Sequence, residues 1–296
     1  MKDLKQILAV GSIAYDSLDT PKGNRERILG GSCTYFSVAA SHYAKTSIIG
    51  VVGNDFDNKS WSLFKEYNID TECVEIADGP TFSWGGKYNS DYSQRDTLFT
   101  NLGVFEHFKP KINPNLKNPI LYLGNIQPSL QLDVIKKVEN PAIIAADSMN
   151  LWIDLFPKQV WELISKVNIF MLNDEEARQL TDETNLEKIS EKFLSLGPKI
   201  VIIKMGGKGS LLAFKDKKHY VSVVPNTEVY DPTGAGDSFA GGVIGYIAKY
   251  GLDNPIEAVV HGSAVASYTV SGFGLEQLLK LNQKELNHRI NQVSFR

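Results

Sequence analysis

The sequence predicts an α/β protein with a mainly parallel sheet and helices on both faces. Short apolar runs alternate with helical patterns along most of the 296 residues. Within each run the hydrophobicity is continuous, as expected for strands buried on both faces. With 43% hydrophobic residues, the chain can bury the core that a three-layer α/β/α arrangement requires.

Six apolar runs are expected to be strands of this sheet: 7–13, 47–52, 120–124, 142–147, 168–172 and 200–205. The helical segments between them make βα units, so these strands should run parallel. Towards the end of the chain, residues 209–224 are typical of a hairpin. Two helices are expected at 235–250 and 254–270.

Two polar segments, 13–29 and 73–101, interrupt this rhythm and carry alternating patterns such as TFSWGGKY and RDTLFT. They predict antiparallel strands that form a small lid beside the main sheet. Since no repeat or long linker divides the chain, we expect one domain over 1–296 with both lid segments inserted in its core. An open lid exposes a strand edge, through which a homodimer can form.

Composition excludes several classes of partner. The formal net charge is −3 with both signs evenly scattered, which leaves no basic face for nucleic acid and no polybasic tail for a membrane. No segment approaches the ~20 apolar residues of a membrane span, so a cytoplasmic protein is expected. Cys33 and Cys73 are expected to be reduced, and the five histidines lack the spacing of a zinc or iron site.

Two familiar phosphate-binding patterns fit poorly. GNDFDNKS, residues 53–60, has Asn58 where the second glycine of a Walker A loop belongs, and it places two aspartates in that loop. GSIAYD, residues 11–16, lacks the glycine spacing of a dinucleotide fold. Neither pattern predicts the binding of a nucleotide.

DPTGAGDSFAGG, residues 231–242, fits better. Gly234 and Gly236 let the backbone expose consecutive N–H groups where a helix begins, which predicts an anion site. Asp237, in the first turn, either caps the helix or accepts a proton from an alcohol during phosphoryl transfer. Gly241 and Gly242 each cost about 1 kcal/mol in a helix, which indicates close packing behind a site.

This motif resembles the C-terminal signature of the PfkB, or ribokinase-like, carbohydrate kinases, and further matches span roughly residues 7–274. These matches are GSIAYD, GGS at 30–32, GVVGNDF, NDEE at 173–176 and KMGGKG at 204–209. The resemblance implies an ATP-dependent kinase with a small β lid over its acceptor. It makes Asp237 the catalytic base and the amides of Gly234, Ala235 and Gly236 the anion hole.

The same resemblance implies residues on the nucleotide side. Asn173 and Glu176 fill the N-x-x-E positions, where Glu176 would act on Mg²⁺ through water. Gly206 and Gly209 match the G-x-x-G that approaches the nucleotide. Lys204 also falls at a nucleotide-binding position, where related kinases often have Thr, so its role stays open.

On the acceptor side, Asp16 and the pair Gly30–Gly31 match substrate-binding positions. A carboxylate can accept hydrogen bonds from two neighbouring hydroxyls, which suits a sugar or a ribosyl group. From the residues alone, a turn aspartate and tight helix packing explain the same positions. Asp231 and Thr233 match positions near a monovalent-cation site that some members use, so K⁺ is a candidate cofactor.

Tyr35 departs from the family pattern, since sugar kinases usually have Asn there. Aromatic residues also crowd the lid around Arg95, where they can stack on a nucleobase or sugar, pack the lid itself or contact a second subunit. The combination GGSCTYFSVAAS, TFSWGGKY, RDTLFT and LGNIQP resembles a bacterial branch of the family in which some members are described as nucleoside kinases. A nucleoside and a free sugar stay near-equal candidates. The sequence is also compatible with a phosphosugar kinase and with a catalytically silent sensor on the same fold.

Overall fold

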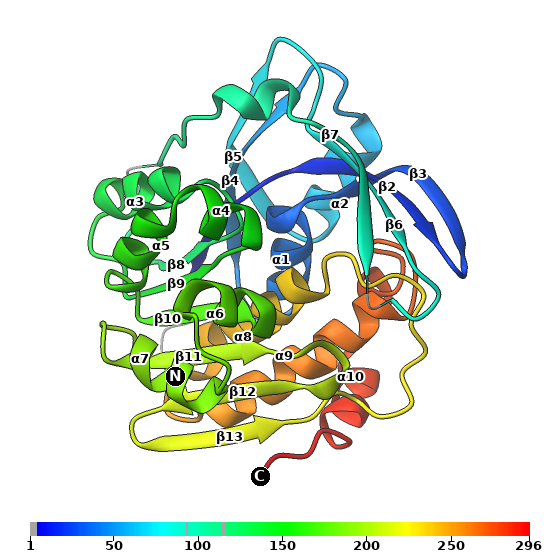
Figure 1. The fold of residues 1–296 in the computed structure, drawn as a ribbon. Helices are drawn as coiled ribbons and strands as arrows, with labels where there is room; N and C mark the ends of the chain where they lie inside the picture. Colours follow the sequence, from blue (N-terminus) through cyan, green and yellow to red (C-terminus); the bar gives the residue numbers. More distant parts are fainter. Residues whose placement is uncertain (1–4, 93, 114–115) are drawn as a thin grey trace.

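The computed structural model describes residues 5–92, 94–113 and 116–296, and it contains a nine-stranded main sheet (Figure 1). The strand order is β13-β12-β11-β10-β9-β8-β1-β4-β5, in which β12 and β13 form an antiparallel hairpin and the others run parallel. The bounds are β1 Ile7–Val10, β4 Thr46–Gly53, β5 Ile69–Ala77, β8 Ile120–Leu123, β9 Ile143–Asp147, β10 Ile169–Asn173, β11 Ile200–Lys204, β12 Ser210–Phe214 and β13 Lys217–Val221. The six predicted strands are contiguous in this sheet, which confirms the α/β prediction.

Helices cover both faces of the sheet because its strands are apolar on both sides. Along β1, Ile7 and Ala9 belong to one buried cluster, whereas Leu8 and Val10 belong to the other. The first cluster packs against α1 Ser32–Ser41, α2 Asn58–Glu66, α8 Ala235–Tyr250, α9 Pro255–Val270 and α10 Gln283–Ile290. The second packs against α3 Pro128–Lys137, α4 Asn150–Leu155, α5 Pro157–Ile164, α6 Asp174–Thr181 and α7 Leu186–Leu194. Short 3₁₀ helices occur at Gly103–His107, Gly206–Lys208 and Leu278–Lys280.

The glycines inside α8 allow it to lie very close to its neighbours. A Cβ on Gly241 would come within 2.5 Å of the Phe36 carbonyl oxygen in α1. A Cβ on Gly242 would be 3.0 Å from the Cα of Gly262 in α9. The close packing predicted behind the DPTGAGD motif is therefore confirmed, and it fixes the start of α8 against the core.

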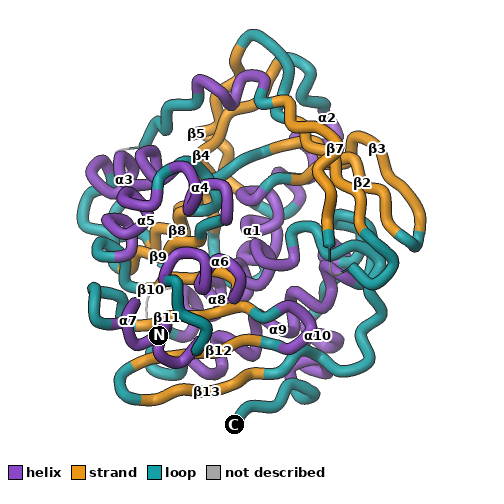
Figure 2. Tube along the Cα trace, viewed as in Figure 1, coloured by secondary structure: helices purple, strands orange, loops and turns teal. Residues whose placement is uncertain are grey.

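The lid is a separate four-stranded sheet with the order β3-β2-β6-β7, and it lies beside the main body (Figure 2). Its strands are β2 Ala14–Thr20, β3 Gly23–Gly30, β6 Ser83–Tyr88 and β7 Arg95–Asn101. Two antiparallel hairpins, β2–β3 and β6–β7, meet through a parallel pairing of β2 with β6. The predicted antiparallel lid is confirmed for both hairpins, and only their junction is parallel, because the two hairpins come from separate insertions.

The predicted lid segment 73–101 also begins too early. Residues 69–77 form β5, which pairs parallel with β4 at the edge of the main sheet. As an edge strand, β5 is only partly buried, so its polar composition resembles that of the lid strands. The second lid segment therefore starts with β6.

The outer strands of the lid present long free edges. Every residue of β7 is exposed, as are the first five residues of β3. Homodimerisation through the lid stays a prediction. Among the described residues, every helix is too short or too polar to cross a lipid bilayer.

Candidate active site

The DPTGAGD motif forms a tight loop that leads directly into α8. Gly234 is the N-cap residue with a left-handed φ of 73°, and α8 begins at Ala235 as predicted. Asp231 is fully buried and fixes the loop, since its Oδ1 accepts from the Thr233 N–H and its Oδ2 from the Gly274 N–H, both at 2.9 Å. The backbone of residues 234–236 thus lies at the positive end of a sixteen-residue helix.

Asp237 lies in the first turn of α8, where the predicted nucleotide side of the site meets the predicted acceptor side. Burial raises the pKa of its carboxyl to about 7, with a further rise from Asp147 and an opposing effect from Lys204. Its charge in turn raises the pKa of Asp16 and Tyr35. A carboxyl with a pKa near neutrality can accept a proton at physiological pH, which is the chemistry of a general base.

The predicted nucleotide side of the site lies at the carboxyl ends of three neighbouring parallel strands. β9 ends at Asp147, β10 at Asn173 and β11 at Lys204, with Asn173 and Lys204 directly paired in register. Ligands of open α/β sheets bind at such ends. Sequence reasoning missed Asp147, although a polar residue that closes the apolar run AIIAAD was a signal for it.

Asn173 and Glu176 form a capping box at the start of α6. The Asn173 side chain accepts from the Glu176 N–H at 2.8 Å, and the Glu176 carboxylate accepts from the Asn173 N–H at 2.9 Å. Burial raises the pKa of Glu176 to about 7, while Lys204 lowers it and Asp147 raises it. The N-x-x-E motif therefore has a structural role in addition to any role in metal binding.

The two glycines of the G-x-x-G segment have different surroundings. Gly206 is exposed, with a φ of +55° and nothing within 4 Å of the point where a Cβ would lie, so its backbone is open to a ligand. Gly209 is buried, and a Cβ there would lie 2.1 Å from the Val221 carbonyl oxygen in β13. Gly209 is thus required by the β12–β13 hairpin itself.

The predicted acceptor residues meet where β2, β3 and α1 converge. Asp16 in β2 is 4% exposed, and a Cβ on Gly30 would come within 2.0 Å of its Oδ2. Gly31 is the N-cap of α1, with a φ of 91° that favours glycine. Burial raises the pKa of Asp16 to about 7, with a further rise from Asp231, while a hydrogen bond from the Gly31 backbone and the charge of Arg95 lower it.

Tyr35 lies between the predicted acceptor residues and residues 231–237, the predicted anion loop. It is 1% exposed, and its ring is in direct contact with Gly234, where a Cβ would come within 2.3 Å of the ring. Its hydroxyl has no hydrogen-bond partner within the described residues. Buried hydroxyls are usually paired, so this unpartnered group is a candidate for a hydrogen bond to a ligand.

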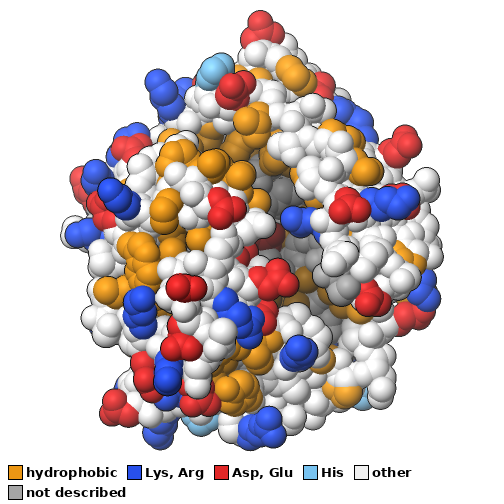
Figure 3. Space-filling view, viewed as in Figure 1, with side chains coloured by type: hydrophobic (Ala, Val, Ile, Leu, Met, Phe, Trp, Pro, Cys, Tyr) orange, Lys and Arg blue, Asp and Glu red, His pale blue; other side chains and the backbone are white. Residues whose placement is uncertain are grey.

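The lid contacts the anion loop directly. Tyr88 and Thr233 share a hydrogen bond of 2.8 Å between their hydroxyls, and Tyr92 donates to the Tyr230 carbonyl oxygen at 3.2 Å. The space-filling view shows the surface hollowed between the lid and the body, with acidic and basic side chains around the hollow (Figure 3). The lid is therefore attached to the motif that would bind the phosphoryl group.

Two lid residues share the face that carries Asp16. Trp84 pairs in register with Asp16, and adjacent residues of paired strands project to the same side. The Trp84 ring lies over Gly86, and the Arg95 guanidinium carbon lies 4.9 Å from the centre of that ring. Phe82 instead stacks on Phe105, so the lid aromatics divide between packing and the acceptor side.

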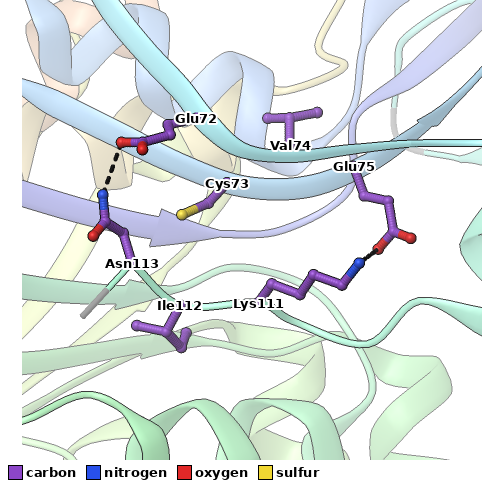
Figure 4. Close-up of a pocket in the computed structure, with 7 residues that line it drawn as sticks. All are labelled: Glu72, Cys73, Val74, Glu75, Lys111, Ile112 and Asn113. Atoms are coloured by element: carbon purple, nitrogen blue, oxygen red, sulfur yellow. Dashed lines mark hydrogen bonds and ion pairs between the residues drawn. The ribbon is translucent and has the colours of Figure 1, made fainter. Parts of the chain in front are cut away.

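A groove of about 480 Å³ lies elsewhere, at the edge strand β5 (Figure 4). The Cys73 thiol points toward segment 111–113, and Lys111 forms a 3.0 Å ion pair with Glu75 at the groove. A 2.8 Å hydrogen bond joins Asn113 to Glu72. None of the predicted site residues lines this groove, so the catalytic chemistry is assigned to the strand ends and the motif.

Within the described parts of the chain, no three His, Cys, Asp or Glu side chains are grouped to hold a metal ion. Mg²⁺ commonly takes one or two carboxylates and completes its shell with water and substrate phosphates. The Glu176 carboxylate at the start of α6 suits that mode of binding, whereas the Asp147 carboxylate is paired with the Lys204 ammonium.

Comparison with known proteins identifies the family. Residues 5–280 match the pfkB family carbohydrate kinases. The chain belongs to this family. As a PfkB kinase, it is an ATP-dependent phosphotransferase with a hydroxyl group as acceptor, and the resemblance in its motifs is confirmed.

Relatives of this PfkB kinase include proteins named as nucleoside kinases. It is 25% identical to a cytidine kinase of Thermococcus kodakarensis, with 86% of this chain and 91% of the relative covered. It is 24% identical to a nucleoside kinase of Methanocaldococcus jannaschii, covering 97% and 99%. A crystal structure from E. coli described as ribokinase II, in complex with ATP and Mg²⁺, superposes with a TM-score of 0.82 at 20% identity, covering 97% and 99%.

Proposed function

We propose that this kinase transfers the γ-phosphoryl group of ATP to the hydroxymethyl group of a nucleoside. The observation that carries the proposal is the acceptor side of the site, where Asp16 and the Trp84–Arg95 pair share one face of the lid. A carboxylate suits the two ribosyl hydroxyls, and a planar guanidinium over an aromatic ring suits a nucleobase. The names of the cytidine and nucleoside kinases among its relatives support this substrate class.

The catalytic roles follow from the start of α8. Asp237 is the base that accepts the proton of the acceptor hydroxyl, and the amides of Gly234, Ala235 and Gly236 stabilise charge on the transferred phosphoryl group. The raised pKa of Asp237, about 7, supports the first role, and the helix N-terminus supports the second. Closure of the lid would exclude water and limit hydrolysis of ATP.

The nucleotide and its cations would bind on the other side of Asp237. The open backbone at Gly206 would approach ATP, and Glu176 would hold water molecules of Mg²⁺, which would supply positive charge against the phosphates. Asp231 and Thr233 would lie beside K⁺. Carboxylate and backbone oxygens are the ligands of such hard cations, and the Asp231 carboxylate is fully buried in the loop.

A phosphorylated sugar suits the acceptor side less well. Asp231 and Asp237 both raise the pKa of Asp16, so carboxylates lie within electrostatic reach of one another there. A phosphate ester would add to this repulsion. A free sugar would satisfy Asp16 but leave the Trp84–Arg95 pair without a partner.

An acceptor screen by coupled ADP detection tests the proposal, with nucleosides, free sugars and phosphosugars at equal concentration. We expect nucleosides to give the highest kcat/KM. Arg95→Met should raise the KM for a nucleoside more than the KM for ribose, because both acceptors depend on Asp16 but only the nucleobase would lie against Arg95. Lys87→Met is the matched control, because Lys87 is an exposed residue of β6 that pairs with Asp19. Preference for a free sugar or phosphosugar would refute the nucleoside assignment.

A further inference from the structure

Lys204 forms a buried ion pair with Asp147 at the carboxyl ends of β11 and β9. The ammonium nitrogen lies 2.5 Å from Asp147 Oδ2, and the two side chains are only 18% and 5% exposed. Charged side chains are rarely buried to this degree unless they are paired. Burying two charges costs desolvation free energy that offsets much of their mutual attraction. Stability alone is therefore a weak explanation for such a pair.

The ammonium lies beside the loop that would bind the phosphoryl group. A Cβ on Gly236 would come 3.3 Å from Lys204 Nζ, so glycine at this position leaves the space between loop and ammonium open. The cation therefore lies next to backbone amides that already favour an anion. Two independent sources of positive potential, a helix N-terminus and an ammonium, meet at one point.

The charges around Lys204 also favour a cation at this position. Burial lowers the pKa of Lys204, but Asp147 and then Glu176 raise it, and the net direction is upward, so the amine stays charged at neutral pH. The carboxylates of Asp147, Glu176 and Asp237 all act electrostatically on this one ammonium, and Asp147 is in direct contact with it. Without it they would repel the polyphosphate of ATP.

We propose that the Lys204 ammonium contacts the phosphoryl group being transferred, and that Asp147 is the residue that positions it. This role rests on the kinase chemistry proposed above but is independent of which acceptor is used. An ammonium has three donors, so it can keep one hydrogen bond to Asp147 and give another to a phosphoryl oxygen. Asp147 holds the flexible lysine stem in one orientation before the substrate arrives.

The phosphoryl transfer in which Lys204 acts needs no reactant other than ATP and the acceptor. The bond between the γ-phosphorus and its bridging oxygen breaks as the bond from the acceptor oxygen to phosphorus forms. The acceptor proton passes to Asp237, and ADP leaves with the electron pair of the broken bond. Lys204 neither gains nor loses a proton, and it stabilises charge on the non-bridging oxygens throughout.

Four variants test the proposal: Lys204→Met, Asp147→Asn, the double variant that combines them, and Lys199→Met. Lys199 is an exposed lysine immediately before β11, at the end of the strand opposite Lys204, so it controls for loss of a charge. The double variant removes both charges, which should restore the stability that Lys204→Met loses by leaving Asp147 unpaired. Thermal unfolding, kcat, KM for ATP and the pH profile are measured for each.

We expect kcat to fall at least about 100-fold in Lys204→Met and to stay low in the double variant although its stability recovers. The acid limb of the pH profile should move to higher pH in Lys204→Met, because Lys204 lowers the pKa of Asp237, and to lower pH in Asp147→Asn. Recovery of kcat together with stability in the double variant would show a purely structural pair and overturn the proposal.

A binding measurement separates this proposal from the proposed function. Calorimetry with a non-hydrolysable ATP analogue and with adenosine reports phosphate contacts without turnover. Lys204→Met should weaken binding of the analogue at least about tenfold and leave the affinity for adenosine unchanged, even if the acceptor proves to be a sugar. Equal affinities in wild type and variant, with kcat unchanged, would contradict a phosphoryl contact, whereas a failed acceptor screen would contradict only the proposed function.

Discussion

The ring of Tyr35 lies directly against Gly234, so that a single methyl group at Gly234 would come within 2.3 Å of it. Tyr35 belongs to the motif on α1 that departs from the sugar-kinase pattern, and Gly234 begins the anion loop. A residue predicted to bind the acceptor is therefore packed on the residue that starts the predicted anion loop. A substitution at Tyr35 or at Gly234 should therefore alter the packing of the other residue.

Gly234→Ala should impair both packing and turnover. The new methyl group meets the Tyr35 ring and the residue keeps a φ of 73°, so we expect a loss of about 1–3 kcal/mol in stability and at least about tenfold in kcat. A double-mutant cycle with Tyr35→Ala measures the contact. Strict additivity of the two changes in unfolding free energy would contradict direct packing.

Tyr35→Phe should change substrate binding without destabilising the fold. The buried hydroxyl has no partner within the described residues, so its removal leaves no donor unpaired in the protein. Loss of one hydrogen bond to the acceptor predicts a rise in its KM of roughly 2- to 12-fold. Calorimetric unfolding and steady-state kinetics check both parts, and a lower melting temperature with unchanged KM would count against the assignment.

The pH profile should follow the ionisation of Asp237. Burial raises the pKa of this carboxyl to about 7, and the base acts only when ionised. We therefore expect kcat/KM to rise by about tenfold per unit below pH ~7 and to level off above it. Asp16 also has a pKa of about 7, so the profile of Asp16→Asn separates the two groups. An acid limb that disappears in this variant would assign it to Asp16 instead.

Gly241→Ala should destabilise the fold by about 1–3 kcal/mol, because its methyl group would lie 2.5 Å from the Phe36 carbonyl oxygen in α1. Gly207→Ala is the stability control, since nothing lies within 4 Å of its Cβ position. Denaturant unfolding of both variants measures the difference. Equal stabilities would show that α1 and α8 can move apart at little cost.

The sequence was sufficient to predict the layers of the fold, because continuous apolar runs such as those of β1 and β10 can only be buried on both faces. It could not separate β5 from the lid, since an edge strand and a lid strand are both half exposed. Pairing of β2 with β6 joins residues far apart in the chain, and no local pattern encodes it.

The candidate site was predictable where one short motif contains the chemistry, as in residues 231–237. The partnership of Lys204 with Asp147 was not, because the two are 57 positions apart and meet only when β9, β10 and β11 align. The contact of Tyr35 with Gly234 is equally non-local. Each of these relationships depends on strand and helix packing rather than on residue spacing.

The proposed mechanism depends above all on Asp237 as the base for phosphoryl transfer. Its sharpest test is the single-turnover rate of Asp237→Asn with ATP and the best acceptor, alongside the affinity of that variant for an ATP analogue. We expect a rate lower by about 10²- to 10⁴-fold with affinity retained within a few-fold. A rate close to that of the wild type would show that Asp237 is not the base.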